Sequence, residues 1–193
     1  GTGLAALSTW ARDRQIDLQY LGTDYATAAL NATRKLARAL KLEIQTQHVD
    51  LEQPIRPQLG QSPRFDLILG MNVFNELSES ALNQIPPSLL DVLSPSGHLV
   101  FIEPAARAPS RKAIGLRDLL VQNKWHLAFP CTHQKPCPAL ATHDGWCHET
   151  WAFERPAFMA RVDQKVGTRR ETLKATWFAM HPPSLANQIA NQV

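Results

Sequence analysis

The stretch Phe65-Asp-Leu-Ile-Leu-Gly-Met71 contains the clearest strand in the sequence. It is almost continuously apolar, which is typical of a parallel strand that is buried on both faces of its sheet. Similar shorter stretches predict further strands at residues 18–22, 43–49, 98–102 and 125–129. Helical patterns separate these strands, and the alternation predicts an α/β domain with a parallel sheet and right-handed crossovers.

The remaining segments complete the expected organisation. Helical spacing predicts helices at residues 2–13, from about 25 to 40, from Ser80 with a fresh start at Pro86-Pro87, and from Pro109 to about Val121. We expect residues 155–170 to be irregular and residues 171–180 to form a final strand. The predicted parts are therefore an α/β domain (1–129), a cysteine–histidine segment (130–150), and a basic segment whose terminal strand completes the sheet (151–193).

Composition and charge exclude several other classes of protein. Of the 193 residues, 44% are hydrophobic and 19% are charged, which excludes a disordered chain. No apolar run approaches the roughly 18 residues needed to cross a bilayer, so we expect no membrane partner. The net charge of +3 is too small by itself to indicate a nucleic-acid partner. We expect one hydrophobic core and a monomer.

Glycines and acids stand where ligands bind in open α/β sheets, beyond the carboxyl ends of the strands. Gly1 and Gly3 open a helix, whose backbone N–H groups a ligand can approach closely, although such a pair also makes a plain turn. Asp24 ends a strand, where its carboxylate suits ribose hydroxyls or simply caps the next helix. Asp50 ends the following strand and suits an adenine amine, or it is only a solvated loop residue.

Polar residues also follow the strand that ends at Met71. Asn72, Asn75 and Glu76 interrupt an otherwise buried stretch, as a cofactor or acceptor pocket requires. The simpler interpretation is a helix start with Asn72 as its cap. We predict these three residues as the catalytic candidates, with a role in placing the acceptor rather than in acid–base chemistry.

The order of these features resembles that of class I S-adenosylmethionine-dependent methyltransferases over roughly residues 1–129. The resemblance implies a Rossmann-like sheet that binds S-adenosylmethionine. It implies that Gly1 and Gly3 border the methionine part of the cofactor, Asp24 the ribose and Asp50 the adenine. It also implies that Met71 and Asn72 form the inner wall. The strand that precedes the glycine turn in this superfamily has no counterpart in the sequence, so we expect a sheet that lacks its first strand.

Five potential metal ligands lie within 18 residues: Cys131, His133, Cys137, Cys147 and His148. Thiolates select zinc or iron–sulfur clusters, and cysteines among proline, glycine and histidine are poor core material. Zinc would be satisfied by the three cysteines and one of the two histidines. An odd number of clustered cysteines argues against a disulfide framework and favours a reducing compartment.

The spacing Cys131-Thr-His133, Cys137-Pro138 and Trp146-Cys147-His148 resembles that of methyltransferase-like assembly factors of the mitochondrial small ribosomal subunit and their bacterial relatives. The resemblance implies a 4Fe–4S cluster on Cys131, Cys137 and Cys147, with a fourth cysteine farther along. We expect that ligand to lie beyond Val193, with His133, His148 or water as alternatives. The resemblance also implies a cytoplasmic protein in a bacterium, or a mitochondrial matrix protein in a eukaryote.

The segment from Arg155 to Lys174 is strongly basic. It has two acids and six basic residues, a net charge of +4: Arg155, Arg161, Lys165, Arg169, Arg170 and Lys174. Such a segment suits RNA phosphates, although charge alone is equally consistent with a solvated loop. The family resemblance favours small-subunit ribosomal RNA as the partner.

The sequence is consistent with two functions, because a methyltransferase-like fold does not by itself establish an enzymatic activity. The chain is a methyltransferase-like protein that acts on ribosomal RNA, or a non-catalytic RNA-binding assembly factor with an iron–sulfur or zinc site. The sequence has no Asn-Pro-Pro-Tyr motif of the kind that serves amino groups. A zinc-stabilised domain that acts on a protein or small molecule is a third, weaker alternative.

Overall fold

A computed structural model of the protein describes residues 1–61, 64–169 and 171–185. The chain divides into two compact units. The first unit comprises Gly1–Arg64 and Leu77–Val92, and the second comprises Phe65–Glu76 and Leu93–Val193. Within the described residues, no helix is long and apolar enough to cross a membrane.

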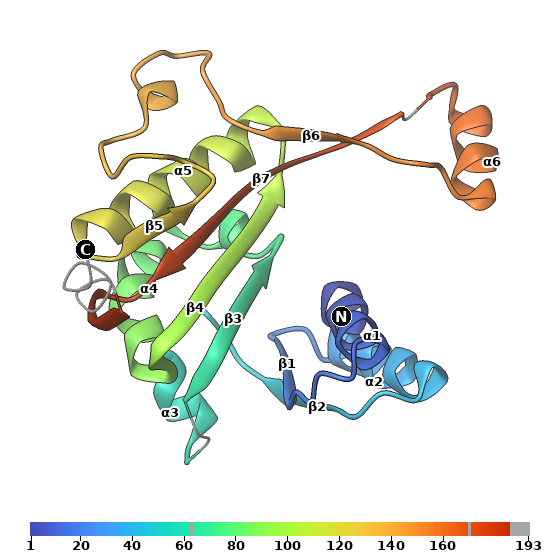
Figure 1. Ribbon diagram of the computed structural model, residues 1–193, viewed down its shortest axis with the longest axis horizontal. Helices are drawn as coiled ribbons and strands as arrows, with labels where there is room; N and C mark the ends of the chain where they lie inside the picture. The colour runs from blue at the N-terminus through green and yellow to red at the C-terminus, as the bar shows by residue number, and fades with distance from the viewer. Residues whose placement is uncertain (62–63, 170, 186–193) are drawn as a thin grey trace. The chain divides into compact units, whose positions relative to one another are not determined.

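The first unit contains a small parallel sheet and its helices (Figure 1). Its elements are α1 (Thr2–Asp13), β1 (Tyr20–Asp24), α2 (Thr27–Leu40), β2 (Ile44–His48), α3 (Ile55–Leu59) and α4 (Glu79–Val92). β1 and β2 pair in parallel, and α2 makes the crossover between them. Leu30, Thr33 and Ala37 of α2 recur at helical spacing and are buried.

Helix α4 runs without a break through Pro86 and Pro87, so the predicted fresh start there is wrong. A proline inside a helix costs about 3 kcal/mol, because it removes a hydrogen bond and crowds the preceding turn. Ile85, Leu89 and Val92 are nearly fully buried. Burying each such side chain contributes roughly 1.5–3 kcal/mol, so the apolar face outweighs the prolines.

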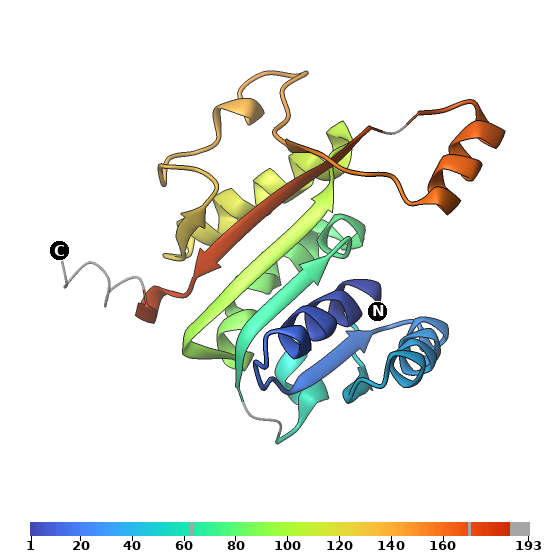
Figure 2. The same ribbon diagram turned by 45° about the vertical axis from the view of Figure 1, so that its right-hand side comes forward.

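The second unit is built on a mixed five-stranded sheet (Figure 2). Its elements are β3 (Phe65–Met71), the 3₁₀ helix η1 (Phe74–Glu76), β4 (Leu93–Pro104), α5 (Arg107–Gln122), β5 (His126–Phe129), the 3₁₀ helix η2 (Pro138–Leu140), β6 (Glu149–Ala152), α6 (Ala157–Val166) and β7 (Thr172–His181). The strand order is β3-β4-β7-β5, and β6 pairs with the first half of β7. α5 contacts β4, β5 and β7.

The strands confirm most of the predicted pattern but not a single parallel sheet. β3 pairs in parallel with β4, whereas β7 is antiparallel to β4, β5 and β6. β1 and β2 form their own sheet, so the expected sheet is divided in two. In the part of the chain that the structure describes, β1 pairs only with β2, and β3 pairs only with β4.

Aromatic side chains fill the centre of the second unit. The rings of Phe74 and Phe101 meet edge to face at 5.6 Å, and those of Phe101 and Phe178 lie 5.3 Å apart. All three residues are buried. Edge-to-face and tilted pairs of this kind are the favoured aromatic geometry, so η1 is fixed against β4 and β7.

A helical arm replaces the predicted irregular segment at residues 155–170. β6, α6 and the first half of β7 form this arm, which leads away from the rest of the sheet (Figure 1). Pro156 stands at the N-cap of α6, and Gly167 ends the helix in the left-handed conformation. Both residues are typical of helix ends, but the basic composition of the segment led us to expect an irregular structure. Phe158, Val162 and Val166 lie four residues apart and are exposed. Arg170 and residues 186–193 lie outside the described residues.

Three histidines from neighbouring strands meet in the second unit. His98 Nδ1 lies 2.9 Å from His181 Nδ1, and the His126 ring stacks on that of His181. Burial lowers the pKa of His181, and the charges of His98 and His126 lower it further. The folded chain therefore binds a proton at His181 less readily than the unfolded chain does.

We predict that acidification weakens the fold through His181. The contribution of His181 to stability is present above its unfolded pKa of about 6.5 and is lost as the pH falls toward the lower folded value. Urea unfolding at a series of pH values should show a smaller loss for His181→Gln than for the wild type. His143→Gln removes an exposed histidine and should keep the wild-type profile. Equal profiles for both variants would contradict the assignment.

Candidate functional site

Helix α5 presents a polar face to the cysteine–histidine segment. Five side chains lie along one side of the helix, because residues three, four, seven or eight positions apart share a helix face: Arg107, Ser110, Arg111, Arg117 and Asp118. Each binds the cysteine–histidine segment through a hydrogen bond. The segment contains little regular structure, so α5 supplies the partners that its backbone lacks.

Arg117 and Asp118 hold the part of the segment that contains Cys131 and Cys137. Arg117 donates to the carbonyl oxygens of His133 at 2.7 Å and Lys135 at 2.6 Å. It also forms an ion pair with Asp118, whose second oxygen accepts the backbone N–H of Cys137 at 3.1 Å. One charged pair on the helix therefore fixes the backbone between the two cysteines.

Cys147 is held from two sides. Its carbonyl oxygen accepts the hydroxyl of Ser110 at 2.6 Å and that of Thr176 at 2.6 Å. Ser110 belongs to α5 and Thr176 to β7. Arg111 donates to three carbonyl oxygens shortly before Cys147, those of Ala139, Thr142 and Gly145.

The structure brings all five predicted ligands to one cavity of about 420 Å³. It is lined by Cys131, His133, Cys137, Pro138, Ala139, Trp146, Cys147 and His148. The three cysteines are free thiols. Nowhere in the described chain do three or more Cys, His, Asp or Glu side chains stand in position to hold a metal ion. The cavity therefore gathers the ligands without closing them into a coordination sphere.

The thiols influence one another across this cavity. Burial raises the pKa of Cys131, and Arg117 opposes that rise through its charge and a side-chain hydrogen bond. Burial also raises the pKa of Cys147, and the neighbouring Cys131 and Cys137 raise it further. Both thiols are therefore protonated at neutral pH, and a metal that binds them must displace their protons.

The two histidines differ in how they meet the cavity. His133 is exposed, and its Nδ1 accepts the backbone N–H of Lys135 at 3.2 Å. The ring of His148 stacks on Trp146, and its Nδ1 is buried with no hydrogen-bond partner among the described residues. A buried unsatisfied nitrogen beside three thiols fits a soft metal ion or cluster, because such a ligand would satisfy it.

The predicted cofactor residues of the first unit have local structural roles. Gly1 is the N-cap of α1, and a Cβ there would lie 2.4 Å from Thr33 Oγ1, so close packing on α2 requires glycine. Gly3 lies in the first turn of α1. Asp24 accepts the N–H of Ala26, and Asp50 accepts that of Glu52. These two acids follow or end adjacent parallel strands, and their part in cofactor binding stays a prediction.

A buried glutamate that was not among the predicted site residues holds the segment that contains the catalytic candidates. Glu103 is fully buried at the end of β4 and accepts the backbone N–H groups of Val73 at 3.1 Å and Phe74 at 2.9 Å. It also accepts the side-chain amide of Asn75. A buried acid must be paired, so a glutamate in an apolar strand signals such a site.

The other residues at this edge of β3 are exposed. Met71 ends β3, and Asn72 follows in the left-handed conformation with φ 54°, its N–H bound to Ile102. Glu76 lies exposed at the end of η1. Asn75 differs from these, because its side chain is bound to Glu103 and its carbonyl accepts Lys112 at 2.8 Å. Asn75 therefore stabilises the conformation of residues 72–76 through these hydrogen bonds.

Solved structures define the class of fold. PH0226 protein from Pyrococcus horikoshii OT3 matches with a TM-score of 0.55 and 11% identity, covering 93% of this chain and 78% of that one. A methyltransferase from Pyrococcus furiosus matches with a TM-score of 0.50 and 8% identity, covering 91% and 68%. At these identities the likeness concerns the fold alone. The chain has an α/β fold with a mixed sheet that resembles methyltransferase structures.

Sequence comparison identifies the family. Residues 1–176 match the family described as "Mitochondrial small ribosomal subunit Rsm22". The chain belongs to this family, which confirms the relationship predicted from the cysteine spacing. Among curated proteins, none matches the chain.

We predict that Glu103→Ala destabilises the second unit by at least about 2 kcal/mol, because it leaves buried N–H groups unpaired. Urea unfolding measures the loss, and proteolysis should become faster between residues 72 and 76. Glu76→Ala removes an exposed carboxylate from the same segment and should change stability by less than about 0.5 kcal/mol. The same loss in both variants would show that Glu103 has no special role.

Proposed function

We propose that this chain is an assembly factor of the small ribosomal subunit that binds its RNA and carries an iron–sulfur cluster on Cys131, Cys137 and Cys147. The observation that carries the proposal is the single cavity shared by these three thiols. Membership of a small-subunit family supports the ribosomal role. It also favours a mitochondrial matrix location where the source is a eukaryote.

The chain's own residues would prepare the cavity for the cluster. Asp118 fixes the backbone of Cys137, while Ser110 and Thr176 fix that of Cys147. When bound, the cluster would cross-link the segment covalently and stiffen the surface beside α5. His148 is the better placed of the two histidines for a further ligand, since its Nδ1 is buried and unsatisfied while that of His133 is engaged.

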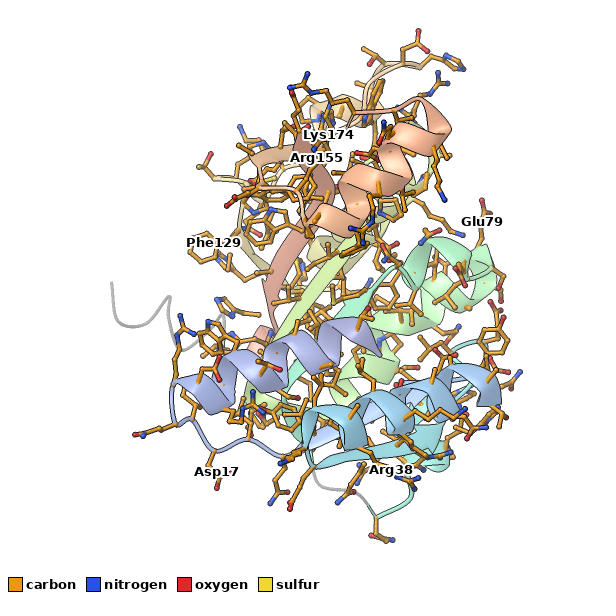
Figure 3. All side chains as sticks on the ribbon, turned by 90° about the vertical axis from the view of Figure 1, so that its right-hand side faces the viewer. Asp17, Arg38, Glu79, Phe129, Arg155 and Lys174 are labelled. Atoms are coloured by element: carbon orange, nitrogen blue, oxygen red, sulfur yellow. The ribbon has the colours of Figure 1, made fainter. Side chains whose placement is uncertain are left out.

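The arm supplies the positive charge for RNA, although not all of its cations are available. Figure 3 shows Arg155 and Lys174 on this part of the chain. Arg155 is paired with the buried Asp163, and Arg169 with Glu171. Arg161 and Lys165, one helical turn apart on α6, are exposed. We therefore assign phosphate binding mainly to these two residues, together with Lys174.

Methyl transfer from S-adenosylmethionine is the second candidate function. Asp24 and Asp50 at the ends of adjacent parallel strands favour cofactor binding, in line with the fold. The engagement of Asn75 with Glu103 argues against a catalytic role for that side chain. Transfer of a labelled methyl group to small-subunit RNA would establish this second function.

We predict that protein purified without oxygen contains iron and sulfide and absorbs visible light. Cys147→Ser should lose most of the iron, because thiolates select the cluster. His143→Asn changes an exposed residue of the same segment and should keep it. If the protein is colourless and contains zinc, the site is a zinc site rather than an iron–sulfur cluster. Protein without bound metal would refute the proposed metal centre.

We predict that the double variant Arg161→Glu/Lys165→Glu weakens binding to small-subunit RNA by at least about tenfold at moderate salt, since two phosphate contacts are lost. Filter binding over a range of salt concentrations measures the affinity and the salt slope. Arg38→Glu/Lys41→Glu makes the same charge change on the first unit and serves as the control. An equal loss of affinity in both double variants would show that RNA is attracted by the overall charge of the chain and not by a site on the arm.

A further inference from the structure

Arg117 is unusual because its side chain is fully buried. Arginine is rarely buried unless its charge is paired and its donors are used. Its terminal nitrogens bind Asp118 and the carbonyl oxygens of His133 and Lys135. Its Nε is also buried but has no hydrogen-bond partner among the described residues. The guanidinium is therefore incompletely satisfied by the folded protein alone.

The thiol of Cys131 lies within reach of the charge of this guanidinium. Arg117 holds the carbonyl oxygens of His133 and Lys135, two and four residues after Cys131, and Cys131 lines the cavity with Cys137 and Cys147. A neutral thiol is a weak acceptor, whereas thiolate sulfur carries negative charge and accepts N–H groups well. The unpartnered Nε of Arg117 would consequently gain a strong acceptor when the cysteines hold a metal.

We infer that Arg117 is a positioning residue of the metal centre, whose N–H groups hydrogen-bond the sulfur of Cys131 and stabilise the added negative charge of the reduced cluster. The inference rests on the cluster proposed above. Asp118 partly offsets the charge of the guanidinium, so the N–H donors of Arg117 and its remaining positive charge both act on the centre. Hydrogen bonds to sulfur and outer-shell partners set both the potential and the metal affinity of such sites.

The variants separate this role from simple anchoring of the backbone. Arg117→Lys keeps a positive charge but loses the planar set of donors. Arg111→Lys is the matched control, because Arg111 also lies on α5 and also binds carbonyl oxygens of the segment. Asp118→Asn removes the charge that offsets Arg117 and keeps a side-chain acceptor for Cys137.

The test uses the full chain, purified anaerobically with its metal. Reductive titration followed by absorbance and electron paramagnetic resonance gives the potential, and competition with a chelator gives the retention of metal. We expect Arg117→Lys to have a lower potential and to lose metal to the chelator about 10–100-fold more readily. Arg111→Lys should match the wild type in potential. Asp118→Asn should raise the potential, which tests the inference even where Arg117→Lys fails to fold.

Each result bears on one proposal. A wild-type potential in both Arg117→Lys and Asp118→Asn would overturn the inference, as would an equal shift in Arg111→Lys. If the wild type holds zinc, the inferred effect on potential is overturned, while a 10–100-fold loss confined to Arg117→Lys would still assign Arg117 to the metal shell. A wild type that holds no metal would instead refute the proposed metal centre itself.

Discussion

The cysteine–histidine segment depends on hydrogen bonds from one face of helix α5. A stretch of this length with little regular structure leaves carbonyl oxygens that water or side chains must satisfy. Arg111 and Arg117 of α5 satisfy five of them, and Arg107 of the same helix pairs with the side chain of Asp144. Because bonds to charged donors contribute about 1.5–3 kcal/mol each, the helix can hold the loop before any metal binds. The cysteine–histidine segment is therefore part of the α/β unit.

This dependence also explains which parts of the site the sequence could predict. Cysteine spacing predicts the ligands because metal chemistry restricts the residue types, and the structure gathers all five at one cavity. The support from α5 was not predicted, because arginines on a helix are usually solvated. The position of these arginines on one side of the helix indicates a structural role only when the helix faces a segment whose carbonyl oxygens lack hydrogen-bond donors. Arg117 is the clearest case, since nothing local distinguishes a buried arginine from an exposed one.

The fold was predictable where the burial of apolar side chains alone decides the structure. It was less predictable where burial competes with the preference of the backbone. The bounds of β3 agree with Phe65–Met71, because a continuously apolar run of that length has few other solutions. At Pro86-Pro87 the backbone preference and the burial of Ile85 conflict, and burial prevails. In α6, exposed Phe158 and Val162 gave no sign of a buried face. Its end signals and the ion pair of Arg155 with Asp163 carry the helix instead.

The polar residues after β3 show why a methyltransferase fold does not by itself make an enzyme. Asn72, Asn75 and Glu76 have the residue types that an acceptor pocket requires. Glu103 nevertheless binds the amide of Asn75 and the N–H groups before it, so this polarity serves the packing of η1. The cysteine cavity has no such internal explanation, because its three cysteines are free thiols and His148 Nδ1 is buried without a hydrogen-bond partner among the described residues. Unsatisfied groups beside satisfied ones point to where a ligand belongs, and here they favour the metal centre over the edge of β3.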